Sequence, residues 1–350
     1  MARSPPASRQ ERYGRTVCVP FFVPSGELCP RSNRPPHCVL LLYTVMISEG
    51  LAGFEPETVT HSQGKTMTTQ ERIALITDST SDIPQRLVEQ YRIAVVPQIL
   101  IWGTEEHLDN VTISPQQFYA RLATDPVHPS SSQPVASDFV KAIEQVKAQG
   151  AEEVVVIVLS NQLSGTVASA LQAAQMVELP VHVVDSLSVS MGLGFQVLAA
   201  ARVREAGGDA STMIEAARQV RERLSLYFSV GTLEYLHRGG RIGGAAKLIG
   251  TALQLKPMLT IDHRTGRIEP AERTRTRRKA LERIYEVFCQ ELSGRERLHV
   301  AVVHGNAPTE AAAFEDRLSR QLKPVELLVT GASPVVGVHA GPGVIGLCGY

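Results

Sequence analysis

The sequence lacks an excess of charge of either sign. Its 350 residues include 35 lysines and arginines against 35 aspartates and glutamates, so the formal net charge at pH 7 is zero. No global field would therefore hold nucleic acid or an anionic membrane surface by counterion release. Any binding of that kind must depend on local clusters of charge.

Cysteines are few, and no membrane-length apolar run stands out. The 5 cysteines are an odd number, and they show no metal-ligand spacing. This usage points to a reducing cytoplasm and to no structural zinc. The apolar run Cys38–Ile47 is too short for the roughly 20 residues of a membrane helix, although it is long enough for a signal-peptide core.

The common catalytic motifs are also missing. The sequence contains no G-x-S-x-G elbow, Walker A loop, H-E-x-x-H helix or C-x-x-C pair. Gly341–Gly346 matches G-x-G-x-x-G, but a dinucleotide site needs this motif at its first strand-to-helix turn, with an acidic residue about 20 positions later. Too few residues follow Gly346 for that arrangement. We therefore expect neither a catalytic residue nor a cofactor or metal.

The first 66 residues differ from the rest. They hold 8 of the 21 prolines and no sustained helical or strand periodicity, so we predict a disordered segment. A start codon assigned too far upstream would explain it, because Met67 stands just before the first clear strand. A signal peptide around Cys38–Ile47 is the alternative, but that run begins far from the N-terminus and follows a proline-rich stretch.

From Arg72 onward, short β-branched runs alternate with amphipathic stretches, which is typical of βαβ units with a mainly parallel sheet. The predicted strands are Ile73–Thr77, Ile93–Ile101, Val154–Leu159 and Val181–Val184. Helices are predicted to begin at Pro84, at Ser114-Pro115, at Ser137 and at Ser164 before Gly165–Met176, followed by Gly192–Glu205 and Ser211–Leu224.

A second sheet is predicted to begin after Leu224. Its strands are Leu226–Val230, Lys256–Ile261, Arg267–Arg273, Leu298–Val303 and Val325–Thr330, and its helices are Thr276–Leu292 and Ala307–Leu322. The turn Asp262–Gly266 joins two of these strands as a hairpin. The sequence thus predicts an α/β protein with two α/β domains, residues 67–224 and 225–350.

Polar residues gather where predicted strands end. Asp78–Asp82 and Ser160–Thr166 each follow an apolar strand and precede a helix, the place where open α/β sheets bind ligands. Turn and cap chemistry explains Asp78–Asp82 equally well, whereas Gly165 beside Ser164 favours close approach of an anion. Ser130–Ser132 stands in a proline-rich loop that is either a ligand loop or a solvated linker.

Two further segments offer anion-binding groups. Leu233–Gly244 surrounds Arg238 and Arg241 with glycines, and a guanidinium there could grip a carboxylate or phosphate, or form an exposed salt bridge. His339 could donate to a bound anion or serve as a structural histidine. Hydroxyls, arginines and a histidine hold anions; they are not a nucleophile with its base.

These motifs, taken in order, resemble the DegV-type fatty-acid-binding proteins, which include the binding subunits of bacterial fatty acid kinases. The resemblance covers about Ile73 to Gly346. The motifs that carry it are Ile76–Asp82, Ser131–Pro134, Leu163–Thr166, Val184–Ser186 with Ser190–Gly194, Leu233–Gly243 and His339–Gly343.

The resemblance implies a DegV-like fold that binds a long-chain fatty acid, with the tail in an apolar tunnel and the carboxylate near the domain boundary. The carboxylate would contact Ser164 of the Leu163–Thr166 element, with Gly165 and Thr166 beside it, and Ser131 or Ser132. Many members have threonine at the place of Ser131, so which of these two serines makes the contact stays open. Arg241 and His339 would complete the polar end.

The resemblance also implies that the chain is not itself an enzyme. In kinase systems a separate ATP-dependent subunit phosphorylates the presented carboxylate. The basic cluster of Arg273, Arg275, Arg277, Arg278 and Lys279 could dock that partner, or it could be a solvated helix face. The rival interpretation is a phosphotransfer enzyme or small-molecule kinase subunit related to dihydroxyacetone kinase, with a covalent adduct on a histidine such as His339.

Overall fold

The computed structural model describes residues 72–248 and 256–350, all within one compact unit, Gln63–Tyr350. The predictions for residues 1–66, including the run Cys38–Ile47, lie outside the described residues. Across the described ranges, no helix combines the length and apolarity needed to cross a membrane.

The first sheet is parallel and has the strand order β2-β1-β6-β7. Its strands are β1 (Ile73–Asp78), β2 (Ile93–Val96), β6 (Glu153–Val158) and β7 (Val181–Asp185). Leu75 and Ile76 are neighbours on β1 and both are fully buried, so the sheet is covered on both faces, as parallel sheets usually are. The predicted α/β fold with a parallel sheet is confirmed.

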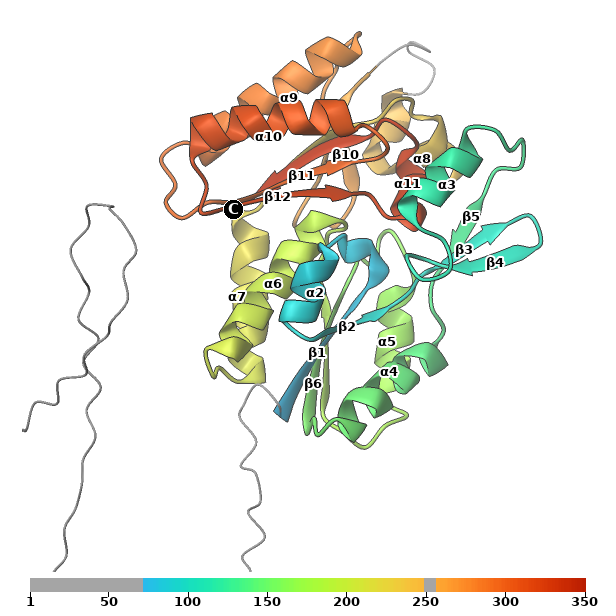
Figure 1. Cartoon of the computed structure of the whole chain (residues 1–350), viewed down its shortest axis with the longest axis vertical. Helices are drawn as coiled ribbons and strands as arrows, with labels where there is room; N and C mark the ends of the chain where they lie inside the picture. The colour runs from blue at the N-terminus through green and yellow to red at the C-terminus, as the bar shows by residue number, and fades with distance from the viewer. Residues whose placement is uncertain (1–71, 249–255) are drawn as a thin grey trace, which may run out of the picture. The chain divides into compact units, whose positions relative to one another are not determined.

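Helices cover the two faces of this sheet (Figure 1). Ile76 packs in one core with α4 (Ala136–Ala148) and α5 (Thr166–Ala174). Leu75 packs in another with α2 (Gln85–Gln90), α6 (Met191–Glu205) and α7 (Ala210–Arg223). Helix α6 is buried along most of its length because it also faces the second sheet.

The second sheet has the order β10-β9-β8-β13-β11-β12. Its strands are β8 (Ser225–Ser229), β9 (Met258–Ile261), β10 (Ile268–Glu272), β11 (His299–His304), β12 (Glu326–Gly331) and β13 (Ile345–Gly349). Helices α9 (Arg277–Leu292) and α10 (Pro308–Leu322) pack on one face, and the other face shares a core with α6 (Figure 1). The predicted hairpin around Asp262–Gly266 is confirmed by the antiparallel pairing of β9 with β10. The division into domains at residues 224 and 225 stays a prediction.

A third, antiparallel sheet has the order β4-β3-β5, with strands β3 (Ile99–Trp102), β4 (Glu105–Leu108) and β5 (Ser130–Ser132). The prediction of one strand over Ile93–Ile101 is therefore wrong. Pro97 offers no N–H to a ladder, and the amide of Gln98 donates instead to Ser79 Oγ at 3.0 Å, so the chain leaves the first sheet there. The prediction of a loop at Ser130–Ser132 is also wrong, because these serines pair with β3 and form β5.

Two predicted helix starts are displaced. Helix α4 begins at Ala136, so Ser137 lies inside it; the Asp138 carboxylate accepts the amide of Val135 and fixes the earlier start. Helix α5 begins at Thr166 with Gly165 at the N-cap, because Ser164 Oγ bonds Thr166 Oγ1 and makes no cap bond. Several short elements were not predicted, among them β4, α8 (Glu234–Arg238), α11 (Pro334–Ala340) and β13.

The start of α3 (Pro115–Leu122) offers a stability test. Ser114 Oγ accepts the Gln117 amide at 3.2 Å, and Gln117 Oε1 accepts the Ser114 amide at 2.9 Å. We expect Ser114→Ala to lower the free energy of unfolding by about 1 kcal/mol, measured by urea denaturation. Ser137→Ala is the control, and it should cost nothing because Ser137 is exposed inside α4. Equal losses in the two variants would contradict this assignment of the caps.

Candidate ligand-binding site

A cavity of about 120 Å³ lies against the face of the second sheet that points toward α6. This is far more than the roughly 10–15 Å³ that one water needs. Most of the wall is apolar. Leu226 and Phe228 on β8, Cys348 on β13, Met191 on α6 and Val336 on α11 are examples. The cavity is therefore suited to a hydrocarbon group larger than a solvent molecule.

Polar side chains from three distant segments meet at one part of this wall. Ser131 Oγ on β5 lies 2.7 Å from His339 Nε2 on α11. Arg241, just after α8, donates from Nε to the Leu163 carbonyl at 2.9 Å and from Nη1 to the Gly239 carbonyl at 2.7 Å. The Arg241 side chain also lines the cavity.

Ser164 extends this polar group. Its Oγ lies 2.9 Å from Thr166 Oγ1, and the buried Thr166 is held in turn by Gln98 Nε2 at 3.1 Å. Helix α5 begins at the same place without a side-chain cap, so its first amides add positive potential.

The structure gathers most of the predicted site residues. Those that line the cavity are Ser131, Ser132, Ser164, Arg241 and His339. Thr166 stands behind Ser164, and Gly165 lies against Gln133, whose Nε2 would be 3.1 Å from a Cβ at Gly165. Gln98 also lines the cavity and was not predicted; its one signal in the sequence is an amide side chain inside an apolar run.

His339 is neutral at pH 7, because burial and then the nearby charge of Arg241 lower its pKa to about 4. Its Nδ1 is buried and has no hydrogen-bond partner among the described residues. It packs against Gly239 so closely that a Cβ added to Gly239 would lie 2.2 Å from it. A proton on Nε2 avoids an unpaired buried N–H at Nδ1. In that tautomer His339 donates to Ser131 Oγ, and the Ser131 hydroxyl proton is free to point at a ligand.

Two buried aspartates hold the start of α11. Asp82 Oδ1 accepts the Ser333 amide at 3.0 Å, and Asp109 Oδ1 accepts the Val335 amide at 3.0 Å. Burial raises the pKa of Asp82 to about 7 and that of Asp109 to about 6. These bonds fix the helix that carries His339. Asp109 was not predicted, since its partner lies 226 residues away.

The segment Asp78–Asp82 also has a structural role. Asp78 Oδ1 accepts the amide of Thr80, and Asp78 Oδ2 accepts the amide of Leu159, which ties the ends of β1 and β6 together. Burial raises the pKa of Asp78. Thr80 is the member of this segment that lines the cavity.

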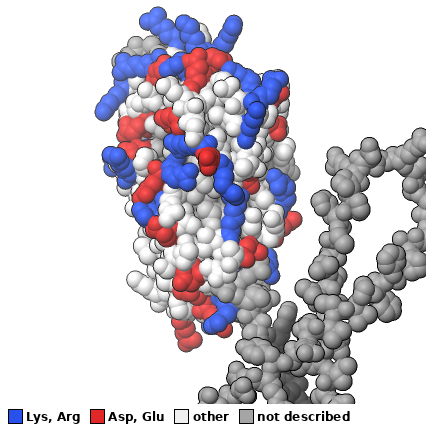
Figure 2. Space-filling model, turned by 90° about the vertical axis from the view of Figure 1, so that its left-hand side faces the viewer, with Lys and Arg blue, Asp and Glu red and all other residues white. Residues whose placement is uncertain are grey.

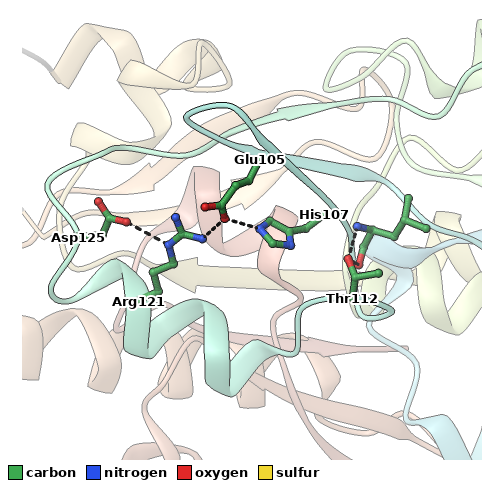
Figure 3. Close-up of polar contacts among 6 residues, drawn as sticks. Glu105, His107, Thr112, Arg121 and Asp125 are labelled. Carbon is green, nitrogen blue, oxygen red and sulfur yellow. Dashed lines mark hydrogen bonds and ion pairs between the residues drawn. The ribbon is translucent and has the colours of Figure 1, made fainter.

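The small sheet that carries Ser131 is tied to α3 (Figure 3). Arg121 on α3 bonds Glu105 on β4 at 2.6 Å and Asp125 at 3.0 Å, while His107 Nε2 lies 3.2 Å from the same Glu105 carboxylate. The Arg121 guanidinium also lies 4.4 Å from the centre of the Trp102 ring on β3. Because β3 pairs with β5, these contacts help to hold Ser131 in place.

Comparison with known proteins identifies the family. A family model described as "Uncharacterised protein, DegV family" matches residues 72–350. A DegV domain-containing protein of Streptomyces coelicolor is 38% identical over 277 residues, which is 79% of this chain and 97% of the relative. The chain belongs to the DegV family. The resemblance predicted from the sequence motifs is confirmed.

Solved structures of DegV proteins share the fold. One, described as fatty acid binding of a DegV family protein from Thermus thermophilus, is 36% identical with a TM-score of 0.74, and the match covers 80% of this chain and 99% of that one. Another, described as DegV, a fatty acid binding protein from Bacillus subtilis, is 32% identical with a TM-score of 0.74, covering 79% and 98%.

The burial of His339 makes a pH-dependent prediction. The pKa of His339 is about 4 in the folded state, against an ordinary value of 6.5. The fold therefore becomes less stable as pH falls from about 6.5 toward 4, because the unfolded chain binds the proton more tightly. His339→Gln removes this contribution, which is on the order of 3 kcal/mol when complete. Urea denaturation between pH 4.5 and 7.5 should therefore show that the free energy of unfolding of the variant rises relative to that of the parent as pH falls.

His237→Gln is the matched control, because His237 is an exposed histidine of the neighbouring helix α8. A difference between parent and His339→Gln that stays constant over this pH range would contradict the assignment of a buried, neutral His339.

Proposed function

We propose that this chain binds a long-chain fatty acid, with the acyl chain in the apolar cavity and the carboxylate beside Ser131, Ser164, Arg241 and His339. One observation carries the proposal: a mainly apolar cavity has its hydrogen-bond donors and its guanidinium together at one part of the wall. The proteins from Thermus thermophilus and Bacillus subtilis that are described as fatty acid binding support it.

The energetics favour such a ligand. Each methylene group taken from water contributes about 0.8 kcal/mol. The carboxylate loses its hydration, so it needs charged or strongly polar donors in exchange. Arg241 supplies the positive charge, Ser131 supplies a hydroxyl aligned by neutral His339, and the first amides of α5 lie beside Ser164.

In this proposal the protein positions the carboxylate and does not react with it. A separate ATP-dependent kinase subunit would phosphorylate the presented carboxylate, and the binding protein itself would need no cofactor. Phosphotransfer through His339 is the alternative. Both ring nitrogens of His339 face protein atoms, Nε2 toward Ser131 and Nδ1 toward Gly239, which favours the binding role.

The kinase would dock on the basic cluster at the start of α9. Arg273, Arg275, Arg278 and Lys279 are exposed there, whereas Arg277 is engaged: its Nε bonds Glu310 at 2.8 Å and its Nη1 donates to the Gly343 carbonyl at 2.7 Å. The face drawn in Figure 2 mixes basic and acidic side chains, with lysines and arginines projecting from its upper end. Docking of the kinase would therefore depend on the basic cluster at the start of α9 and not on the charge of the surface as a whole.

Lipid extraction tests the binding proposal. Protein purified from cells should release close to one fatty acid per chain, identified by mass spectrometry. Arg241→Ala should weaken binding by tenfold or more, since a hydrogen bond to a charged group contributes roughly 1.5–3 kcal/mol, and Ser164→Ala should weaken it less. Arg238→Ala is the matched control, because Arg238 pairs with the exposed Glu234 and does not line the cavity.

Absence of fatty acid from the parent protein, together with sugar-dependent phosphate transfer, would instead support the phosphotransfer enzyme. Equal retention of lipid by Arg238→Ala and Arg241→Ala would contradict the polar site as described.

Charge reversal tests the docking proposal. Arg273→Glu with Arg275→Glu should lower acyl-phosphate formation by the partner kinase while leaving fatty acid affinity unchanged. Arg277 is left intact because its bond to Gly343 supports the loop that follows α11. The control reverses two exposed arginines on other helices, Arg86 on α2 and Arg218 on α7. Unchanged phosphorylation in the first pair, or an equal loss in the control pair, would rule this surface out.

A further inference from the structure

Strand β13 turns alternate residues toward the cavity. Val344, just before the strand, Gly346, Leu347 and Cys348 line the cavity. The side chains of Val344 and Cys348 belong to the core that faces α6, whereas those of Ile345 and Leu347 belong to the core under α9 and α10 on the other face. Val344, Gly346 and Cys348 thus form a row on one face of β13 that is part of the cavity floor, and the middle position of this row carries no side chain.

The neighbouring strands surround the same gap. Gly346 lies opposite Phe228 on β8 and opposite Val303 on β11, and both of these side chains line the cavity. Gly346 is therefore bordered by four side chains on the cavity floor, two along its own strand and two across it. The missing side chain leaves a depression between them.

Neither backbone conformation nor close packing explains this glycine. Gly346 is not among the glycines with positive φ, and the nearest atoms to a Cβ there would be Phe228 Cβ at 3.4 Å and the Tyr227 carbonyl oxygen at 3.7 Å, which are ordinary contacts. At Gly349 of the same strand, by contrast, a Cβ would lie 2.9 Å from the Phe288 ring. What a side chain at position 346 would occupy is cavity space.

One end of this row lies nearer the polar side chains of the cavity than the other end. Val344 lies close to the end of α11, which carries His339, whereas Cys348 lies farther along β13 and pairs with Leu226 on β8. Four residues of a strand span about 13 Å at roughly 3.3 Å per residue. The part of the cavity at Cys348 and Leu226 is thus remote from the polar group, and Gly346 stands between the two.

We propose that Gly346 determines the length of acyl chain that the cavity accepts, by keeping open the passage from the polar group to the far part at Cys348 and Leu226. This inference rests on the proposed binding of a fatty acid. A side chain at position 346 would narrow the passage. An acyl chain that ends before this point does not meet the added side chain, whereas a longer chain must cross it.

The test compares delipidated parent protein with Gly346→Ala and Gly346→Val, titrated with decanoate and with hexadecanoate by calorimetry. The valine variant should lose at least tenfold in affinity for hexadecanoate relative to decanoate, and the alanine variant should shift less in the same direction. Gly331→Ala is the matched control, since Gly331 ends β12 of the same sheet, lies outside the cavity, and a Cβ there meets no atom closer than 4.0 Å.

An unchanged ratio of the two affinities in Gly346→Ala and Gly346→Val would overturn the inference, and so would an equal loss for both acids, which would indicate a structural role. Gly346→Ala decides the matter if the valine variant does not fold. Parent protein that binds neither acid would overturn the fatty acid proposal itself. Parent protein that binds both, with variants that keep its ratio, would overturn the role of Gly346 alone.

Discussion

The hydrogen bond between Ser131 and His339 joins two parts of the chain that are 208 residues apart, and the polar end of the cavity depends on it. Different contacts hold Ser131 and His339 in place. Ser131 belongs to the short strand β5, which exists because β3 pairs with it. His339 belongs to α11, and the amides at the start of this helix donate to Asp82 and Asp109. Gly239 completes the arrangement by leaving room for the imidazole ring.

Removal of water explains the charge states around the cavity. Burial raises the pKa of Asp82 and of Asp109 and lowers that of His339, so in each case it works against the charged form. Arg241 is the one charged side chain among the described residues that line the cavity. A single guanidinium in such surroundings matches a single carboxylate, and the long apolar wall matches the chain attached to it.

The sequence predicted the elements whose signals are local. β1, β6 and α9 lie within a residue or two of their predicted bounds, because apolar periodicity and cap residues such as Thr276 belong to the element itself. Predictions failed where a distant partner decides the structure. Ser130–Ser132 becomes a strand because of its pairing with β3, which no local pattern reveals. The break of Ile93–Ile101 at Pro97 is different, because the proline itself is a local signal that a strand is interrupted.

The candidate site follows the same rule. Motif resemblance located Ser131, Ser164, Arg241 and His339, which the fold brings to one wall. It did not locate Gln98 or Asp109, whose bonds to Thr166 and Val335 cross 68 and 226 residues of sequence. Those supporting contacts are set by the packing of whole elements, which the residues next to them in sequence do not encode.

The binding of a fatty acid at this site can be tested by a crystal structure of the protein with hexadecanoate bound. We expect a carboxylate oxygen within hydrogen-bonding distance of Ser131 Oγ and of the Arg241 guanidinium, with the acyl chain lying against β8 and β13. A carboxylate placed elsewhere in the cavity, or a fatty acid bound outside it, would contradict the proposed site.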